Sequence, residues 1–266
     1  MYETTYHRPQ TLTEAASIIS SAEDGKLLAG GQTLIATMKQ RLAAPSDVID
    51  LRHIAELKGI TETADGAIRI GACTTHAEVA ASEAVKRILP GLAKLAGLIG
   101  DPHVRHMGTL GGSISNNDPA ADYPAALVAL GATVVTDRRE LAAEDFFTGL
   151  FETALEEGEI VTAVRFPAAQ RSAYEKFPNP ASRYAMAGVF VAQASDGSVR
   201  VAVTGAGQNG VFRVPAMEAA LAAKWSPDAI AGITVPAGDL LSDIHGSAEY
   251  RANLVTVMAK RAVAAA

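Results

Sequence analysis

Residues 27–34 read LLAGGQTL, an apolar run that ends in two consecutive glycines and continues into polar residues. The segment KLLAG (26–30) has the length and composition of a buried strand, and the apolar spacing of QTLIATMKQRL (32–42) predicts a helix. A strand that turns into a helix through glycine exposes backbone N–H groups at the helix N-terminus, where the helix dipole attracts anions. Because glycine has no Cβ, a phosphate can come close to the backbone. The stretch therefore predicts a phosphate-binding turn, to which Thr33 adds a hydroxyl donor.

A second glycine pair stands in TLGGS, residues 109–113. Its hydroxyl and amide groups form a similar set of donors. Two such turns facing each other would suit a pyrophosphate, whose charge is spread over two linked groups. Neither turn matches the G-x-G-x-x-G pattern of dinucleotide-binding folds or the G-x-x-x-x-G-K-S/T pattern of the P-loop. An isolated glycine pair is more often a simple turn, so these residues alone leave both a turn and a dinucleotide-type site open.

Composition excludes several classes of function. The chain has 266 residues, of which 48% are hydrophobic and 20% charged, as in ordinary globular proteins. Its net charge of −6 argues against nucleic-acid binding as the main function, because contacts to the phosphates need a cluster of basic residues. No apolar run reaches the roughly 18–20 residues that span a bilayer, and the N-terminus lacks the pattern of a secretory signal. We therefore expect a cytoplasmic protein with no transmembrane segment and no nucleic-acid partner.

Cysteine and histidine usage limits the redox and metal chemistry. Cys73 is the only cysteine, which excludes an internal disulfide, a cysteine-based zinc site and an iron–sulfur cluster held within this chain. His103 and His106 have helical i, i+3 spacing, but only Asp101 is nearby as a further ligand, so we expect no metal site. A redox cofactor would therefore be organic or belong to another chain.

The order of predicted elements indicates an α+β architecture in three parts. The first part alternates helix and strand. The second opens with a hairpin around Asp65-Gly66 and continues with helices and further strands. The third contains an antiparallel hairpin around Asp196-Gly197 and ends in a long helix that Ser247 can cap. The predicted boundaries of the three parts are 1–57, 58–168 and 169–266.

Four segments, taken in order, resemble one family. They read LLAGGQTLIATMKQRLAAPSDVIDL, VRHMGTLGGSISNNDPAADYPAALVALGATV, EGEIVTAVRFP and DIHGSAEYRANLVTVMAKRAV. With them the chain resembles, over essentially its whole length, the FAD-binding medium subunit of the molybdenum hydroxylases, a group that includes aerobic carbon monoxide dehydrogenase and bacterial relatives of xanthine dehydrogenase. The resemblance implies a two-subdomain FAD-binding fold of the PCMH/vanillyl-alcohol-oxidase type. A C-terminal antiparallel-sheet-plus-helices domain of the CO dehydrogenase flavoprotein type would follow it.

The resemblance also implies where FAD binds, with its pyrophosphate and ribityl chain between the two glycine segments. Asp122 matches an acidic position that hydrogen-bonds the cofactor, Lys176 a basic residue that reaches the flavin, and Tyr184 an aromatic residue over the isoalloxazine. Ile99 and Val161 match apolar positions beside FAD. The cofactor-binding role falls in full on Leu27, Leu28, Ala29, Gly30, Gly31, Gln32, Thr33, Leu34, Ile99, Thr109, Leu110, Gly111, Gly112, Ser113, Asp122, Val161, Lys176 and Tyr184.

Three of these side chains also have a plain structural interpretation. Lys176 can be one more solvated lysine, Tyr184 a core or rim aromatic, and Asp122 the cap of the helix that follows it. The sequence also departs from the family pattern: Thr33 replaces a more usual serine, and His106 stands near an asparagine common in relatives. The details near the flavin ring therefore depend on the structure.

The function implied by the resemblance is that of an electron-transfer flavoprotein subunit of a multi-subunit oxidoreductase. A large partner subunit would carry molybdopterin, and a small partner subunit would carry 2Fe–2S clusters that relay electrons to FAD. The flavin would pass them to an external acceptor, in a heterotrimer. One alternative is a self-contained flavin reductase of related fold, such as that of UDP-N-acetylenolpyruvoylglucosamine, and another is a scaffold subunit that has lost FAD.

Overall fold

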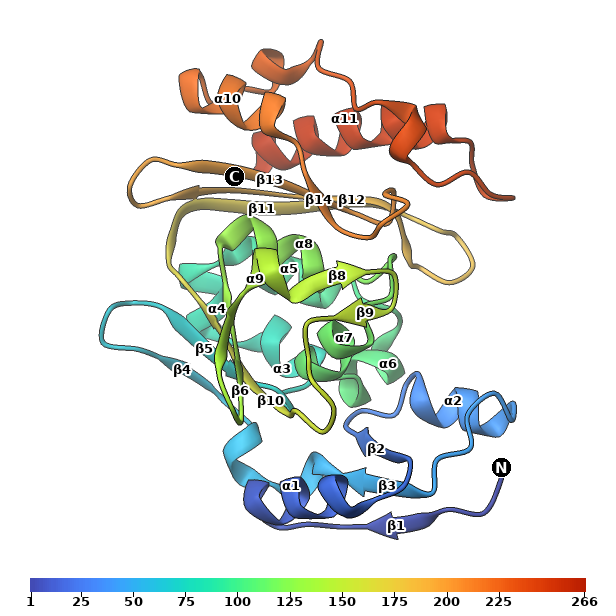
Figure 1. The fold of residues 1–266 in the computed structure, drawn as a ribbon. Coiled ribbons are helices and arrows are strands. Elements are labelled where there is room, and N and C mark those ends of the chain that lie inside the picture. Colours follow the sequence, from blue (N-terminus) through green and yellow to red (C-terminus); the bar gives the residue numbers. More distant parts are fainter.

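The computed structural model describes residues 1–266. Its N-terminal part is a three-stranded parallel sheet in the order β1-β3-β2, with α1 packed against it (Figure 1). The Thr11 hydroxyl caps α1 by accepting a hydrogen bond from the Glu14 N–H at 3.2 Å. The helix α2 follows the first glycine pair and ends at Lys39, so Leu42, predicted inside it, is exposed. The bounds are β1 Thr5–His7, α1 Leu12–Ser21, β2 Gly25–Leu28, α2 Leu34–Lys39 and β3 Asp47–Asp50.

The middle part is built on a five-stranded antiparallel sheet in the order β4-β5-β10-β6-β7. Gly66, with φ of +78°, lies in the turn of the predicted β4–β5 hairpin. The strands are β4 Ile60–Glu62, β5 Ile68–Gly71, β6 Thr133–Thr136, β7 Glu140–Ala142 and β10 Val161–Phe166, and a separate short hairpin pairs β8 Phe147–Gly149 with β9 Glu152–Thr153.

Helices fill the space beside this sheet (Figure 1). Every residue of α8 is buried, because the helix lies between the middle part and the C-terminal sheet, with which it makes many contacts. The helices are α3 His76–Ala81, α4 Glu83–Ile88, α5 Pro90–Gly97, α6 Pro102–Met107, α7 Leu110–Asn116, α8 Tyr123–Leu130 and α9 Ala143–Phe146.

The C-terminal part is a four-stranded antiparallel sheet in the order β11-β12-β13-β14, covered on its outer face by α10 and α11 (Figure 1). Along β12, Val189 and Val191 pack with α11, whereas Phe190 and Ala192 join the core of the middle part. Both faces of the sheet are therefore buried. The bounds are β11 Ala169–Pro178, β12 Ala185–Ala194, β13 Val199–Thr204, β14 Phe212–Arg213, α10 Pro215–Ala223 and α11 Ala248–Ala265.

The structure confirms the two predicted hairpins and the C-terminal helix, and it adds a strand to the C-terminal sheet. The strand β11 was not predicted, although β12 and β13 form the predicted hairpin. Ser247 caps α11 as predicted, accepting a hydrogen bond from the Tyr250 N–H at 3.2 Å. The Tyr250 ring, however, remains partly exposed and packs edge-on against Phe177, with ring centroids 6.2 Å apart. None of the helices is both long and apolar enough to cross a bilayer.

Candidate functional site

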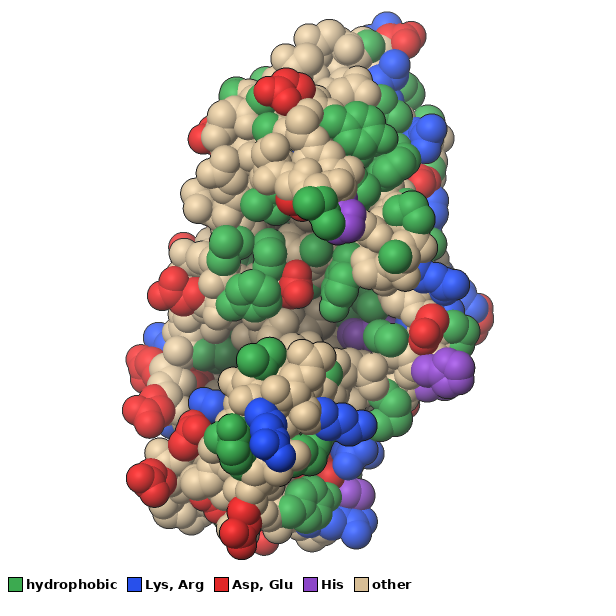
Figure 2. Space-filling view, turned by 90° about the vertical axis from the view of Figure 1, so that its right-hand side faces the viewer, with side chains coloured by type: hydrophobic (Ala, Val, Ile, Leu, Met, Phe, Trp, Pro, Cys, Tyr) green, Lys and Arg blue, Asp and Glu red, His purple; other side chains and the backbone are tan.

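A cavity of about 540 Å³ lies where the N-terminal sheet, the helices of the middle part and the β11–β12 turn meet. Figure 2 looks onto the face of the molecule that carries α2 and α6, which is hollowed near its middle between apolar side chains. Every residue predicted to bind the cofactor lines this cavity except Leu110 and Lys176. Residues far apart in the sequence are thus brought around one hollow.

The first glycine segment presents unpaired amides to the cavity. None of the backbone N–H groups of residues 29–34 donates a hydrogen bond to another group of the protein. Gly31 has φ of +70°, a conformation that favours glycine. Six consecutive unpaired donors beside a cavity are groups from which an anion could accept hydrogen bonds, and the predicted phosphate binding stays a prediction.

The close approach at Gly30 has another cause than the one predicted. A Cβ at this position would lie 2.2 Å from the Met107 carbonyl oxygen and 2.7 Å from the Gly108 Cα. The group that comes close to the backbone at Gly30 is therefore the chain just before the second glycine segment. Glycine at position 30 therefore lets the two segments come into contact.

The second glycine segment differs from the first, because its amides are already paired. Leu110 donates to the Thr74 carbonyl at 3.1 Å, Gly111 to the Ala72 carbonyl at 2.8 Å, and Gly112 to the Thr109 hydroxyl at 3.2 Å. Leu110 is fully buried in the core. This segment therefore offers no cradle of unpaired N–H groups. It offers the exposed backbone surface of Gly112 and the hydroxyl of Ser113.

An ion pair lies at another part of the cavity wall. The Lys176 ammonium contacts both Asp122 carboxylate oxygens, at 2.9 and 3.1 Å, and the Tyr174 hydroxyl donates to the same carboxylate at 2.6 Å. Both charged side chains are 4% exposed. Asp122 makes no capping hydrogen bond to α8, so the helix-cap interpretation is wrong. Burial raises the pKa of Asp122, while the charge of Lys176 and the Tyr174 hydroxyl oppose that rise.

Lys176 is neither solvated nor part of the cavity lining, because its ammonium is directed to Asp122. Tyr184 stands in the β11–β12 turn, lines the cavity and keeps 51% of its surface exposed. Burial of part of its ring and the nearby carboxylates of Asp118 and Asp122 raise the pKa of Tyr184. Ile99 and Val161 add apolar side chains to the cavity wall.

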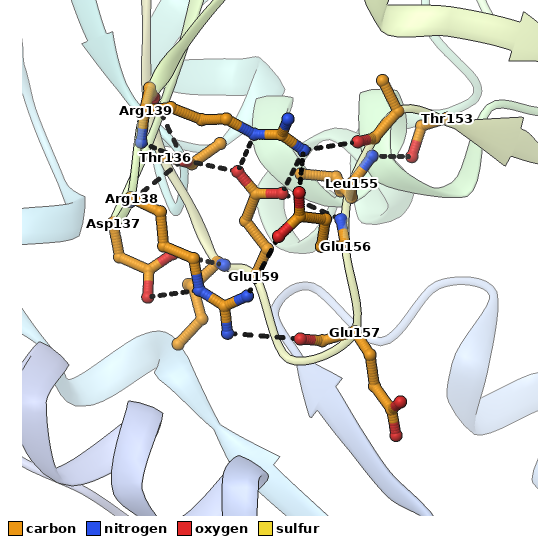
Figure 3. Close-up of polar contacts among 11 residues, drawn as sticks. Thr136, Asp137, Arg138, Arg139, Thr153, Leu155, Glu156, Glu157 and Glu159 are labelled. Atoms are coloured by element: carbon orange, nitrogen blue, oxygen red, sulfur yellow. Dashed lines mark hydrogen bonds and ion pairs between the residues drawn. The ribbon is translucent and has the colours of Figure 1, made fainter.

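A charged network supports one wall of the cavity (Figure 3). Arg139 forms a bidentate contact with Glu159, with Nε–Oε1 at 2.9 Å and Nη2–Oε2 at 2.8 Å. The Thr136 hydroxyl and the Glu156 N–H also donate to this carboxylate, both at 2.8 Å. These contacts lower the pKa of Glu159 to about 2, with the Arg139 hydrogen bonds as the largest cause. The network fastens the loop before β10, whose Leu155, Glu159 and Ile160 line the cavity.

The sequence reasoning missed His76 and Glu159, which both line the cavity. His76 is the first residue of α3, whose N-terminus has a complete capping box between Thr75 and Glu78. A histidine directly after Thr75, which has capping-box spacing to Glu78, is the only signal that the sequence offers for it. Glu159 stands two residues before β10, and its partner Arg139 is 20 residues earlier.

Comparison with known proteins agrees with this geometry. Residues 2–169 match the family described as the FAD binding domain in molybdopterin dehydrogenase. The chain is 38% identical to the nicotine 6-hydroxylase medium subunit of Paenarthrobacter nicotinovorans, covering 97% of this chain and 95% of that one. It is 37% identical to the carbon monoxide dehydrogenase medium chain of Afipia carboxidovorans, covering 97% and 94% of the two chains.

Among solved structures, a chain of reconstituted CO dehydrogenase from Oligotropha carboxidovorans superposes with a TM-score of 0.88 at 35% identity, covering 98% of this chain and 96% of that one. The match confirms the predicted fold class over nearly the whole chain. The protein therefore belongs to the FAD-binding family of molybdopterin dehydrogenases, as an oxidoreductase subunit of the medium-chain type.

Proposed function

We propose that this chain is the electron-transfer subunit of a molybdenum-containing hydroxylase or dehydrogenase. In this assembly, FAD receives electrons from 2Fe–2S clusters on a small partner subunit and delivers them to an external acceptor. The large partner subunit carries molybdopterin, and the three chains form a heterotrimer. Support comes from the relatives, which are medium chains of such oxidoreductases. The observation that carries the proposal is the unpaired amide row of residues 29–34 facing a cavity of about 540 Å³.

The residues present fit FAD. The amides of residues 29–34 donate to its pyrophosphate, and Thr33 and Ser113 contribute hydroxyl groups. Gly112 has no side chain and is exposed in the cavity wall, so a phosphate would meet the backbone of α7 there. When bound, FAD supplies the exchange of electron pairs and single electrons that such a subunit requires.

Two side chains act on the flavin end of the site. Lys176 orients the Asp122 carboxylate, which keeps acceptor capacity for an N–H group of the cofactor. Tyr184, which lines the cavity from the β11–β12 turn, would stack on the flavin ring and limit the access of water and acceptor to it. Lys176 thus acts on the flavin through Asp122.

The proposal is tested with a Gly112→Val variant. Gly112 is exposed in the cavity wall, and apart from its own cap Thr109 the nearest atom to an added Cβ is the Ala29 Cβ at 3.7 Å. The new side chain would therefore extend into the phosphate path rather than into the core. We expect the affinity for FAD, measured by quenching of flavin fluorescence, to fall more than about tenfold, a change of about 1.4 kcal/mol.

Gly232→Val is the matched control, because a Cβ at Gly232 meets no atom within 4 Å and the residue lies outside the cavity. It should bind FAD as the wild type does. Equal FAD affinity in Gly112→Val and wild type would contradict this arrangement of the site. Rapid turnover of NADPH by the isolated chain with a small substrate would favour a self-contained reductase instead.

A further inference from the structure

His76 is a buried polar residue in the cavity wall with no partner in the protein. Its side chain is 4% exposed and makes no hydrogen bond, and its Nδ1 atom is fully enclosed without a partner. Leaving a buried polar group unpaired is unfavourable, so such groups are uncommon without a function. Because Nδ1 has no exposed surface, Nε2 is the ring nitrogen that can reach a ligand in the cavity.

The backbone around His76 is arranged to leave Nε2 uncovered. A Cβ at Gly108 would lie 2.6 Å from Nε2, so any other residue at position 108 would press against this nitrogen. Gly108 also lies against Gly30, because a Cβ added at Gly30 would meet the Gly108 Cα. The imidazole thus lies beside the narrow section of the cavity where the two glycine segments meet. The backbone N–H of His76 holds the two residues together by donating a hydrogen bond to the Gly108 carbonyl at 3.0 Å.

The imidazole is neutral at physiological pH. Burial and the nearby charge of Arg105 lower the pKa of His76 to about 4. A neutral imidazole carries one N–H donor and one acceptor nitrogen. It can therefore donate a hydrogen bond to a phosphate or hydroxyl oxygen without adding a buried charge.

We propose that His76 is a positioning residue of the cofactor site, whose Nε2–H donates a hydrogen bond to an oxygen of the phosphate–ribityl chain of FAD. The proposal rests on the binding of FAD proposed above and adds a residue to it. It accounts for the unpaired imidazole, for the need for glycine at position 108 and for the place of both beside the first glycine segment.

His76→Leu, made in the full chain, tests the proposal. Leucine keeps the apolar volume of the side chain and removes the unpaired polar group. We therefore expect the melting temperature without FAD to be equal to or higher than that of the wild type, while the Kd for FAD rises about tenfold. If His76 only supported the fold, the His76→Leu variant would have a lower melting temperature, and its affinity for FAD would fall in proportion to that loss of stability.

Two further variants make the result specific. His76→Gln can place an amide N–H near the position of Nε2 and should restore most of the affinity for FAD. Tyr123→Phe is the matched control, because the Tyr123 hydroxyl is another unpaired buried group, its ring lies 5.4 Å from the imidazole, and it does not line the cavity. Its Kd for FAD should stay within twofold of the wild-type value.

The outcomes separate this inference from the function on which it rests. A wild-type chain that binds no FAD would overturn the proposed function, and the inference with it. A wild-type chain that binds FAD, together with His76→Leu of unchanged Kd, would overturn only the role of His76. The role of His76 would also be overturned by a combined result: His76→Leu loses affinity together with melting temperature, and His76→Gln does not restore the affinity.

Discussion

At the residue scale, the site depends on contacts between residues that are distant in the sequence. The glycine pair at 30–31 indicated a phosphate-binding turn, and the unpaired amides agree with that interpretation. The sequence did not show that Gly30 faces Met107, because the approach of two segments depends on tertiary structure. The resemblance likewise predicted that Lys176 reaches the flavin, whereas the structure buries its ammonium against the Asp122 carboxylate and outside the cavity lining.

The Asp122–Lys176 pair gives a stability prediction at this scale. Lys176→Met removes the cation and leaves a fully buried carboxylate, so we expect the free energy of unfolding to fall by about 3 kcal/mol. Adding Asp122→Asn to this variant removes the unpaired charge and should recover more than half of the loss. Urea unfolding of both single variants and the double variant measures the coupling. Additive losses in the double variant would show that the two side chains do not act as a pair.

At the scale of elements, sequence patterns predicted those with strong periodicity and missed those without it. The β4–β5 hairpin, α8 and the β12–β13 hairpin were predicted because turn residues and apolar runs define them. The strand β11 was missed because its sequence, AQRSAYEKFP, has charged residues on both faces and therefore lacks the alternation of a typical strand. In the structure, Glu175 pairs with Lys94 and Lys176 pairs with Asp122. The helix α2 was predicted too long, since its exposed end at Leu42 has no packing partner to continue it.

The loop before β10 gives a pH prediction at this scale. The pKa of Glu159 is about 2 in the folded protein and has an ordinary value of 4.5 when the carboxylate is unpaired. The unfolded chain therefore binds the proton more readily, and the stabilisation by Arg139 is fully present above about pH 4.5 and is lost as the pH falls toward 2. Because Arg139 is 36% exposed and screened by solvent, we expect a loss of about 2 kcal/mol.

Glu159→Gln should lower stability at pH 7 by a similar amount and flatten the pH dependence between 4.5 and 2. The measurement is the free energy of unfolding as a function of pH, by chemical denaturation. Exchanging Glu157 for glutamine is the control, because only its backbone carbonyl takes part in the network, as an acceptor from Arg138. A wild-type and a Glu159→Gln curve of equal slope would contradict the role given to this ion pair.

At the scale of the whole molecule, the cavity lies where the three parts meet. The N-terminal part supplies the amide row, the middle part supplies Gly112 and Asp122, and the β11–β12 turn of the C-terminal part supplies Tyr184. Lys176 of β11 lies behind this wall and contacts Asp122. The predicted boundaries at 57/58 and 168/169 stay a prediction, because shared cores join the parts: Phe190 of β12 packs in the same cluster as α8. Only the family resemblance assigned all three parts to one cofactor. The two glycine pairs alone were equally compatible with simple turns.

The most direct test of the account is purification of this chain with its native partners, followed by analysis of flavin, molybdenum and iron. The account predicts FAD equimolar with this chain, in one assembly that also contains molybdenum and iron. In the same assembly, Gly112→Val should lose the flavin and keep both metals, because the metals belong to the partner subunits. Native assembly without flavin, or with flavin that the Gly112→Val variant retains in full, would contradict the proposed site.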